Sequence, residues 1–480
     1  ALIAIYRPVI KAVLKAKTLT IGLAVIILAV SIWPVTKVGS EFMPNLNEGT
    51  LLYMPTTLPG LSITKSAELL QTQDRIIKSF PEVASVYGKS GRAQTATDPA
   101  PTEMFETIIN LKPKEEWRPG VTTDSLVAEM DKALQFPGVS NAWTMPIKAR
   151  IDMLSTGIRT PVGVKVIGTD LTAMDQVARQ VETVLKTVPG TSSAYAERVM
   201  GGYYLEILPN REQLARYGLM ISDLQDVISM ALGAEPLTTT VEGRERYTVA
   251  LRYPRDLRSD PQAIAKDVVV SLPGGGTVPL GEVADIKLTQ GPTTIRTENA
   301  KLATYVYVDI RGRDLGGYVE AARKAVNEQV KLPPGTYLVW SGQFEYLERA
   351  EARMQLVVPV TLMIIFLLLF LNFRRLTETL IVMLSLPFAL VGGFWLMWWL
   401  GYNISVAVAV GFIALAGVAA ETGVVMLIYL DHASREVQAE CILEGRPYTR
   451  ADLYHAIMVG AVERVRPKMM TVVAIMAGLL

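Results

Sequence analysis

Four long apolar runs divide the chain into segments that suit a membrane and segments that suit water. Each run has about the 20 mostly apolar residues that a helix needs to cross the hydrocarbon layer. The runs cover residues 18–37, 355–372, 378–400 and 404–430. A fifth run begins near residue 469. We therefore expect a membrane protein with four spans and the start of another.

The two ends of the sequence affect how the outermost runs are interpreted. The stretch "WPVTKVGS" follows the first run and lacks the small-x-small pattern of a signal-peptide cleavage site. We expect that run to be a retained helix. The sequence begins with "ALIAIYRPV" rather than with an initiator methionine, so we expect both ends to be breaks in a longer protein.

Basic residues beside the apolar runs predict the orientation, because short loops rich in Lys and Arg stay in the cytoplasm. Such residues precede the first run, separate the second from the third and precede the fifth, whereas residues 401–403 have none. They are Arg7, Lys11, Lys15, Lys17, Arg374, Arg375, Arg446, Arg450, Arg464, Arg466 and Lys468. We therefore expect residues from about 38 to 350 to lie on the outer side of the membrane.

One motif recurs four times in this outer region: a predicted helix, a proline that ends it, and a strand. The helices are expected over residues 62–79, 123–135, 172–187 and 316–331. The segments that follow are "FPEVASVY" from Phe80, "FPGVSNAW" from Phe136, "VPGTSSAY" from Val188 and "PPGTYLVW" from Pro333. The wider gap before the last proline predicts an insertion of approximately residues 210–300.

These patterns predict an α+β membrane protein: a transmembrane helical bundle with two ferredoxin-like (split βαβ) modules and an inserted strand-rich subdomain. The predicted domains are a cytoplasmic flank with the first transmembrane helix (1–37), a first outer module (38–147), a second outer module (148–209 and 301–350), the inserted docking-type subdomain (210–300), three transmembrane helices (351–430), a cytoplasmic connection with an amphipathic helix (431–468) and the start of a further transmembrane helix (469–480). A cleft between two such modules is a usual place for a small ligand.

Composition narrows the class further. The chain is 50% hydrophobic and 19% charged with a mean hydropathy of +0.29, and its net charge of +1 gives no sign of nucleic-acid binding. The single cysteine, Cys441, excludes a disulfide framework within the chain. Two histidines, His432 and His455, are too few for an imidazole zinc centre. The sequence also lacks a phosphate-binding loop of the Walker type, so we do not expect nucleotide to drive it.

One acid stands out inside the last complete apolar run. Glu421 lies in "GVAAETGVVMLIYL", and a carboxylate at membrane depth costs several kcal/mol unless it is paired or faces water. We expect it to load and unload a proton; the alternative is a buried, permanently protonated acid. Lys468 lies at the mouth of the fifth run, where a lysine ordinarily reaches toward the head groups. Alone, Lys468 favours that structural interpretation.

Four stretches carry a family resemblance: "GSEFMPNLNEGTLLYMPTTLPGLS" (39–62), "SGQFEYLERA" (341–350), "GFIALAGVAAETGVVML" (411–427) and "RVRPKMMT" (464–471). They resemble the C-terminal half of a heavy-metal efflux pump of the resistance-nodulation-division (RND) superfamily, in its copper/silver, CusA-type branch. The resemblance covers nearly the whole chain. It implies a proton-driven secondary transporter rather than an enzyme, located in a bacterial inner membrane, with residues 38–350 in the periplasm. The chain would hold the seventh of twelve spans to the start of the eleventh.

The resemblance also implies site residues. Glu421 and Lys468 match a proton relay that is completed by an aspartate from the other half of the family's chain. Met104, Met153 and Met200 match a three-methionine metal site in the periplasmic cleft, although each one alone is typical of core packing. Thioethers are soft, neutral ligands that favour Cu(I) or Ag(I), so these ions are the expected cargo, protons are the coupling ion, and no permanent cofactor is expected. Four further methionines near the relay are expected to pass ions outward: Met426, Met469, Met470 and Met476.

The partners implied by the resemblance are two further copies in a homotrimer, a periplasmic membrane-fusion adaptor, an outer-membrane channel, a small periplasmic metallochaperone and the lipid bilayer. Two alternatives remain open at this stage. An RND pump for divalent zinc, cobalt or cadmium would share the scaffold but line its cleft with carboxylates and histidines. A membrane-anchored binding or assembly module would have no transport function and no need of Glu421 as a proton site.

Overall fold

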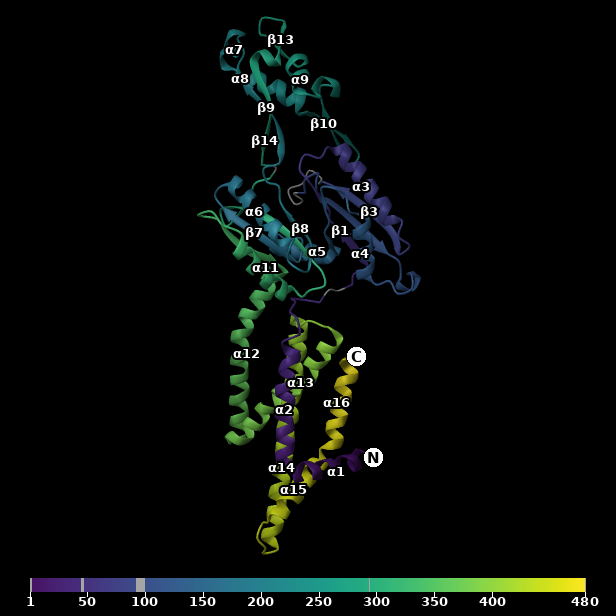
Figure 1. Cartoon of the computed structure of the whole chain (residues 1–480), viewed down its shortest axis with the longest axis vertical. Helices are drawn as coiled ribbons and strands as arrows, with labels where there is room; N and C mark the ends of the chain where they lie inside the picture. Colours follow the sequence, from purple (N-terminus) through teal and green to yellow (C-terminus); the bar gives the residue numbers. More distant parts are fainter. Residues whose placement is uncertain (1, 45–46, 92–99, 293, 480) are drawn as a thin grey trace.

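The computed structural model of the chain describes residues 2–44, 47–91, 100–292 and 294–479. The molecule is elongated and has three tiers (Figure 1). Apolar helices form one end, two β-sheets lie side by side in the middle, and a smaller subdomain forms the far end (Figure 1). The mixture of helices and strands agrees with the predicted α+β class.

Within the described residues, four helices are long and apolar enough to cross a membrane, and each covers most of one predicted run. They are α2 (Lys17–Val35), α12 (Gln343–Phe373), α13 (Leu376–Leu400) and α14 (Val406–Leu443). The four predicted spans are thus confirmed by length and composition. The fifth run forms α16 (Val465–Leu479), and α14 continues without a break past the predicted end of its run.

Two shorter helices lie at the end of the bundle that is farthest from the sheets (Figure 1). They are α1 (Leu2–Lys15) and α15 (Arg450–Glu463), and α15 is the helix predicted in the cytoplasmic connection. Gly460 lets α15 approach α14 closely, because a Cβ at this position would lie 2.9 Å from the carbonyl oxygen of Tyr429. Beside this contact, Cys441 is buried against Val437 and Ala456.

The first sheet follows α2 in the chain and has the strand order β3-β4-β1-β6. Its elements, in chain order, are β1 (Thr50–Tyr53), α3 (Ile63–Lys78), β3 (Val83–Ser90), β4 (Phe105–Leu111), α4 (Thr123–Ala133) and β6 (Trp143–Thr144). Side chains of β1 alternate between two faces. Leu51 and Tyr53 enter the core beneath α3 and α4 with Ile77 and Leu126, whereas Leu52 enters a separate cluster on the other face.

The second sheet repeats this order of elements and strands. It runs β15-β16-β7-β17, and β8 also pairs with β16, on the side opposite β7. Its elements are β7 (Val162–Gly168), α6 (Leu171–Leu185), β8 (Thr191–Ala196), β15 (Arg296–Glu298), β16 (Lys301–Ile310), α11 (Leu315–Gln329) and β17 (Tyr337–Gly342). The core between its sheet and helices includes Val164, Val181, Val306 and Tyr318. β17 passes directly into α12 at Gly342, so the sheet and a span are joined without a loop.

The predicted helix–proline–strand motif is confirmed at all four places. Pro81 lies between α3 and β3, Pro137 between α4 and β5 (Val139–Ser140), Pro189 between α6 and β8, and Pro334 between α11 and β17. β5 is short and pairs with β2 (Thr56–Thr57) rather than with the first sheet.

The insertion is a small subdomain on a two-stranded stalk. The stalk consists of β9 (Gly202–Pro209) and β14 (Ala284–Gly291), which pair antiparallel along their whole length. The subdomain has its own core, which includes Leu214, Leu224 and Val268. Its other elements are α7 (Arg211–Arg216), α8 (Ile221–Val227), β10 (Pro236–Glu242), β11 (Glu245–Ala250), α9 (Pro261–Asp267), β12 (Val269–Ser271), β13 (Thr277–Pro279) and α10 (Leu280–Val283). β10 and β11 form an exposed hairpin.

Two predicted domain boundaries differ from the division between the sheets, and three others, at 350/351, 430/431 and 468/469, fall inside the helices α12, α14 and α16. The boundary at 147/148 lies within α5 (Pro146–Thr156), which packs on the first sheet through Ala149. The predicted end of the insertion at residue 300 lies beyond β15, and β15 pairs with β16 of the second sheet. Both differences arise from contacts between segments that are far apart in the sequence, and local sequence patterns do not predict such contacts.

Candidate functional site

A cleft of about 570 Å³ lies between the two sheets. The first-sheet side supplies residues from β2 and from the turn before β4, and the second-sheet side supplies residues from β8, β16 and the adjoining segments. The lining residues are Thr56, Thr57, Pro59, Pro101, Glu103, Met104, Arg159, Tyr195, Glu197, Arg198, Val199, Thr294, Arg296 and Tyr307. We refer to this space as the cleft. Met104 is the one predicted metal ligand among the described residues that line it.

Arginines and tyrosines form much of the second-sheet wall. The Arg159 guanidinium carbon lies 4.2 Å from the centre of the Tyr307 ring, and Arg159 Nη2 donates to Thr56 Oγ1 across the cleft at 2.6 Å. Glu197 Oε1 accepts from the Tyr307 hydroxyl at 3.0 Å and from Arg296 Nε at 3.2 Å. Burial raises the pKa of the Tyr307 hydroxyl, so it remains a hydrogen-bond donor at physiological pH. These contacts brace the wall that faces Met104.

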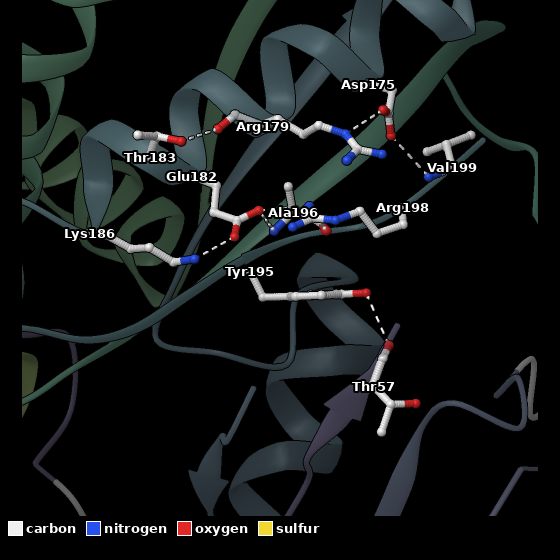
Figure 2. A network of polar contacts seen from close by, with 10 residues as sticks. All are labelled: Thr57, Asp175, Arg179, Glu182, Thr183, Lys186, Tyr195, Ala196, Arg198 and Val199. Atoms are coloured by element: carbon white, nitrogen blue, oxygen red, sulfur yellow. Dashed lines mark hydrogen bonds and ion pairs between the residues drawn. The ribbon is translucent and has the colours of Figure 1, made fainter. Parts of the chain in front are cut away.

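Carboxylates of α6 fix the end of β8 beneath the cleft (Figure 2). Glu182 accepts from Arg198 Nη1 at 2.7 Å, from Lys186 Nζ at 2.6 Å and from the Ala196 amide at 3.1 Å. Burial alone would raise the pKa of Glu182, but the hydrogen bonds from Arg198 and Lys186 bring it below its usual value. Asp175 Oδ1 accepts from the Val199 amide at 3.2 Å, so the segment that leads to Met200 is held in place.

The predicted metal ligands are distributed unevenly. Met104 and Met153 are both partly buried and pack against one hydrophobic cluster, whose buried members are Leu52, Met54 and Ala149. Met104 reaches this cluster from the start of β4, and Met153 reaches it from α5. Met200 follows Val199 at the edge of the cleft and is not among the described residues of that cluster. The structure therefore brings Met104 and Met153 together and leaves Met200 apart from them.

Met54 is a candidate that sequence reasoning missed. Its side chain is 1% exposed and belongs to the buried part of the cluster that receives Met104 and Met153. In the sequence it ends the apolar stretch "TLLYM", which is typical of a strand core. The only available signal was its even spacing from Leu52, which places both residues on one face of the extended segment.

A second pocket, of about 450 Å³, lies between α14 and α16. Its lining residues are Val418, Glu421, Thr422, Val425, Met426, Arg464, Lys468, Thr471 and Val472. Glu421 and Lys468, predicted from distant parts of the sequence, thus line one pocket. Arg464 was not predicted as a site residue; its guanidinium carbon stacks 4.3 Å from the centre of the Tyr429 ring. Of the four further methionines, Met426 lines this pocket, whereas Met469, Met470 and Met476 are exposed on α16.

The side chains that bind hard or borderline cations do not form a metal site in the part of the chain that the structure describes. No group of three or more His, Cys, Asp or Glu residues there is arranged to hold a metal ion. The donors that do gather beside the cleft are thioether sulfurs.

The structure combines a bundle of apolar helices long enough to cross a membrane, two β-sheets with a cleft between them, and a pocket between helices that is lined by an acid and a lysine. This arrangement is that of a multi-span membrane protein with a large region outside the bundle. The chain belongs to the AcrB/AcrD/AcrF family, whose family model matches residues 1–480. The predicted membership of the RND superfamily is thereby confirmed.

Several relatives are similar over the whole chain. The SilA protein of Salmonella typhimurium is 51% identical over 480 residues, which are 100% of this chain and 45% of SilA. The cation efflux system protein CusA of Escherichia coli K12 is 50% identical over 479 residues, 100% of this chain and 46% of CusA. The cobalt-zinc-cadmium resistance protein CzcA of Cupriavidus metallidurans is 35% identical over 483 residues, 98% of this chain and 44% of CzcA.

The fold is also that of a solved structure. An X-ray crystal structure of a heavy metal efflux pump, crystal form II, superposes with a TM-score of 0.86 at 30% identity, covering 97% of this chain and 46% of that chain. The chain therefore spans less than half the length of the relatives it matches.

Proposed function

We propose that this chain is part of a proton-driven exporter of Cu(I) and Ag(I) in the bacterial inner membrane. The observation that carries the proposal is the packing of Met104 and Met153 in one cluster at the wall of the cleft. In the proposed cycle, the ion enters from the periplasm, is held by thioethers and leaves toward the outer-membrane side. The 50% identity to a cation efflux system protein over the full chain supports this assignment.

The two sheets are, in this proposal, the paired ferredoxin-like modules of the periplasmic region. The first sheet has the element order βαββαβ with its strands arranged second, third, first, fourth. The second sheet has the same order apart from the short additional strand β15, which supports the assignment. The contacts that a ligand makes between two such modules depend on how far apart the modules are. Closing and opening of the cleft would then alternately hold and release the ion.

Thioether sulfur suits the cargo. It is a soft and neutral donor that favours Cu(I) and Ag(I) over zinc and other harder cations. A neutral site also avoids the strong attraction that would trap a cation in an exporter. The lining arginines work in the same direction, because their positive charge weakens the hold of the cleft on any cation.

Glu421 and Lys468 are proposed as the proton relay. Both line the pocket between α14 and α16, where a proton taken up by Glu421 changes how Lys468 and Arg464 must be paired. Each proton that crosses a potential of 100 mV contributes about 2.3 kcal/mol. The direct junction of β17 with α12 offers a mechanical path from the membrane to the second sheet.

The full transporter, in this proposal, is a homotrimer that works with a periplasmic adaptor, an outer-membrane channel and a small periplasmic metallochaperone. The inserted subdomain stands at the end of the molecule farthest from the membrane helices and presents an exposed hairpin (Figure 1). Such a position suits a docking role at the outer end of the molecule.

Two alternatives predict different behaviour. Export of divalent zinc, cobalt or cadmium, the metals in the name of CzcA, would use oxygen and nitrogen donors, and no such group is found within the described part of this chain. A membrane-anchored assembly module would move no ions.

The test uses the full-length protein in vesicles with an imposed proton gradient. We expect uptake of Ag(I) that depends on the gradient, little uptake of Zn(II), and loss of Ag(I) uptake in Met104→Leu and Met153→Leu. Met220→Leu serves as the matched control, because Met220 is 66% exposed on the inserted subdomain, far from the cleft. Zn(II) uptake that equals Ag(I) uptake and survives both substitutions would support the divalent alternative, and absence of any uptake would support the assembly module.

A further inference from the structure

We propose that Arg159 forms an anion site in the cleft, which takes a small monovalent anion of the halide class together with the soft cation. This inference rests on the proposed export of Cu(I) and Ag(I), because the anion accompanies that cargo. The starting observation is the charge of the cleft. Three arginines and two glutamates line it, an excess of one positive charge in the lining of a cleft whose proposed cargo is itself a cation.

Two of the three arginines have carboxylate partners. Arg198 Nη1 lies 2.7 Å from Glu182 Oε2, and Arg296 Nη2 lies 3.2 Å from Glu197 Oε1. These two pairs are therefore compensated within the protein. Arg159, in contrast, makes no ion pair with any residue that the structure describes.

The remaining acid of the lining is not a partner of Arg159. Glu103 Oε1 accepts from the Gly60 amide at 3.0 Å. No ion pair joins Glu103 to Arg159 in the described ranges of the chain. Arg159 therefore has no carboxylate beside it in this arrangement.

The guanidinium of Arg159 has donors that are not used. Nη2 donates to Thr56 Oγ1 at 2.6 Å, and the guanidinium carbon lies 4.2 Å from the centre of the Tyr307 ring. Nε is buried and has no hydrogen-bond partner among the described residues. Arginine does not lose its proton in proteins, so the charge persists and a partly buried charge needs a counter-charge. The aromatic ring supplies only part of it.

Thr56 places this guanidinium beside Met104. An isolated antiparallel bridge pairs Thr56 with Met104. The Cβ atoms of directly opposed residues lie about 4.5–5.5 Å apart on one face, and the hydroxyl that receives Arg159 Nη2 is attached to one of these two Cβ atoms. Met104 and Arg159 also line the same cleft. An anion held by Arg159 is therefore close to the Met104 sulfur.

A halide suits both neighbours. Its single negative charge matches the single unpaired guanidinium, and chloride or bromide is also a ligand that soft monovalent metal ions accept. The anion offsets the positive lining, which otherwise weakens the hold of the cleft on a cation. Binding of the cation and binding of the anion should then strengthen each other by the same factor, because coupling between two sites is reciprocal.

The first measurement is chloride binding to the purified full-length protein without metal, in a gluconate buffer. Bound chloride broadens the chloride NMR signal, and bromide should reverse this broadening. Arg159→Gln keeps a donor for Thr56 but removes the charge, so most of the broadening should be lost. Arg150→Gln is the matched control and should bind chloride like the wild type, because Arg150 is exposed on α5 and has no ion pair among the described residues.

The second measurement is Cu(I) affinity, determined without oxygen by competition with a chelator, so that chloride complexes in solution cancel. We expect the wild type to bind Cu(I) about fivefold or more tightly in chloride than in gluconate, and Arg159→Gln to show no such difference. Wild-type crystals of the full-length protein soaked in bromide need no variant, and an anomalous scattering peak is expected beside the Arg159 guanidinium.

Equal broadening in the wild type and Arg159→Gln, or bromide peaks that do not include Arg159, would overturn the anion site and leave the proposed export intact. Chloride binding at Arg159 that leaves Cu(I) affinity unchanged would overturn the link between anion and cargo. A protein that binds chloride at Arg159 but neither binds nor transports Cu(I) and Ag(I) would instead contradict the proposed function itself. A melting temperature equal to that of the wild type will show that Arg159→Gln is folded.

Discussion

Arg198 Nη1 lies 2.7 Å from Glu182 Oε2, and both side chains are largely shielded from water beneath the cleft. The pair joins α6 to the end of β8, where the chain turns toward Met200. Because Glu182 also receives the Ala196 amide, one carboxylate fixes both a side chain and the backbone of this wall.

Removing this carboxylate should loosen the wall. Glu182→Ala leaves Arg198 without its partner, and breaking a buried pair from one side costs about 3–5 kcal/mol. Lys186→Ala is the matched control, because Lys186 bonds to the same carboxylate but is 55% exposed, and exposed pairs contribute about 0–1 kcal/mol. We expect a lower melting temperature and faster oxidation of Met200 in Glu182→Ala only. Equal effects of the two substitutions would contradict the role given to Arg198.

Asp309 should make the stability of the region around the second sheet depend on pH. This residue of β16 is buried, and burial raises the pKa of its carboxyl to about 6, with the nearby Asp131 acting in the same direction and Arg311 against it. The folded protein therefore binds the proton more tightly than the unfolded chain, whose ordinary value is 3.8. The free energy of unfolding is expected to fall as pH rises from about 4 to about 6, by at most about 3 kcal/mol.

Asp309→Asn removes this dependence. The variant should melt at a higher temperature than the wild type at pH 7.5, and the difference should vanish below about pH 3, where the wild-type carboxyl is protonated in both states. Melting curves of the full-length protein across this range provide the measurement. A variant that is less stable than the wild type at pH 7.5 would show that the ion pair with Arg311, 3.9 Å away, outweighs the burial of the charge.

Glu421→Gln should abolish coupling while leaving metal binding intact. The amide keeps the size of the side chain but carries no titratable proton, so a proton gradient can no longer change the charge of the pocket shared with Lys468. We expect loss of gradient-driven Ag(I) uptake with an unchanged silver affinity, measured by transport into vesicles and by equilibrium binding. Glu436→Gln, at an exposed position farther along α14, is the control and should transport normally. Normal transport by Glu421→Gln would exclude the relay.

Gly342→Ala should disturb the junction between the second sheet and α12. Gly342 has φ +87° and ψ −152°, a conformation reserved almost entirely for glycine, and an added Cβ would lie 2.7 Å from the Pro161 carbonyl oxygen. The strain is expected to cost about 1–3 kcal/mol and to lower transport more than silver binding. Gly274→Ala provides the comparison, since a Cβ there meets nothing within 4 Å and its φ is not positive. Melting temperature and uptake measured on both variants will test the junction.

Local patterns in the sequence were sufficient to predict much of the fold. The spans follow from run length, and each predicted helix before a proline agrees with α3, α4, α6 or α11 within a few residues, because proline ends helices by a local steric effect. The division of this region into two modules could also be predicted, because the helix–proline–strand motif occurs twice in each sheet. What the sequence did not reveal was pairing between distant segments, which assigned β15 to the second sheet and α5 to the first.

The site was predicted less completely for the same reason. Glu421 is conspicuous because a charge is expensive in an apolar run, whereas its pairing with Lys468 was expected only from the family resemblance; the two residues line one pocket. Met54 is apolar among apolar neighbours, and its meeting with Met104 depends on a strand register that no short motif specifies. The pKa of Asp309 depends likewise on burial beneath elements far away in the chain.

The length of α14 has a consequence for how the inner end of the molecule moves. At 1.5 Å per residue, its 38 residues form a rod of about 57 Å, nearly twice the hydrocarbon thickness of about 30 Å. The overhang is clasped by α15 through Gly460 and Cys441. If this rod tilts within the lipid, the displacement is therefore largest at its C-terminal end near Leu443. A crosslink or a bulky label at that end is expected to slow the proposed transport cycle.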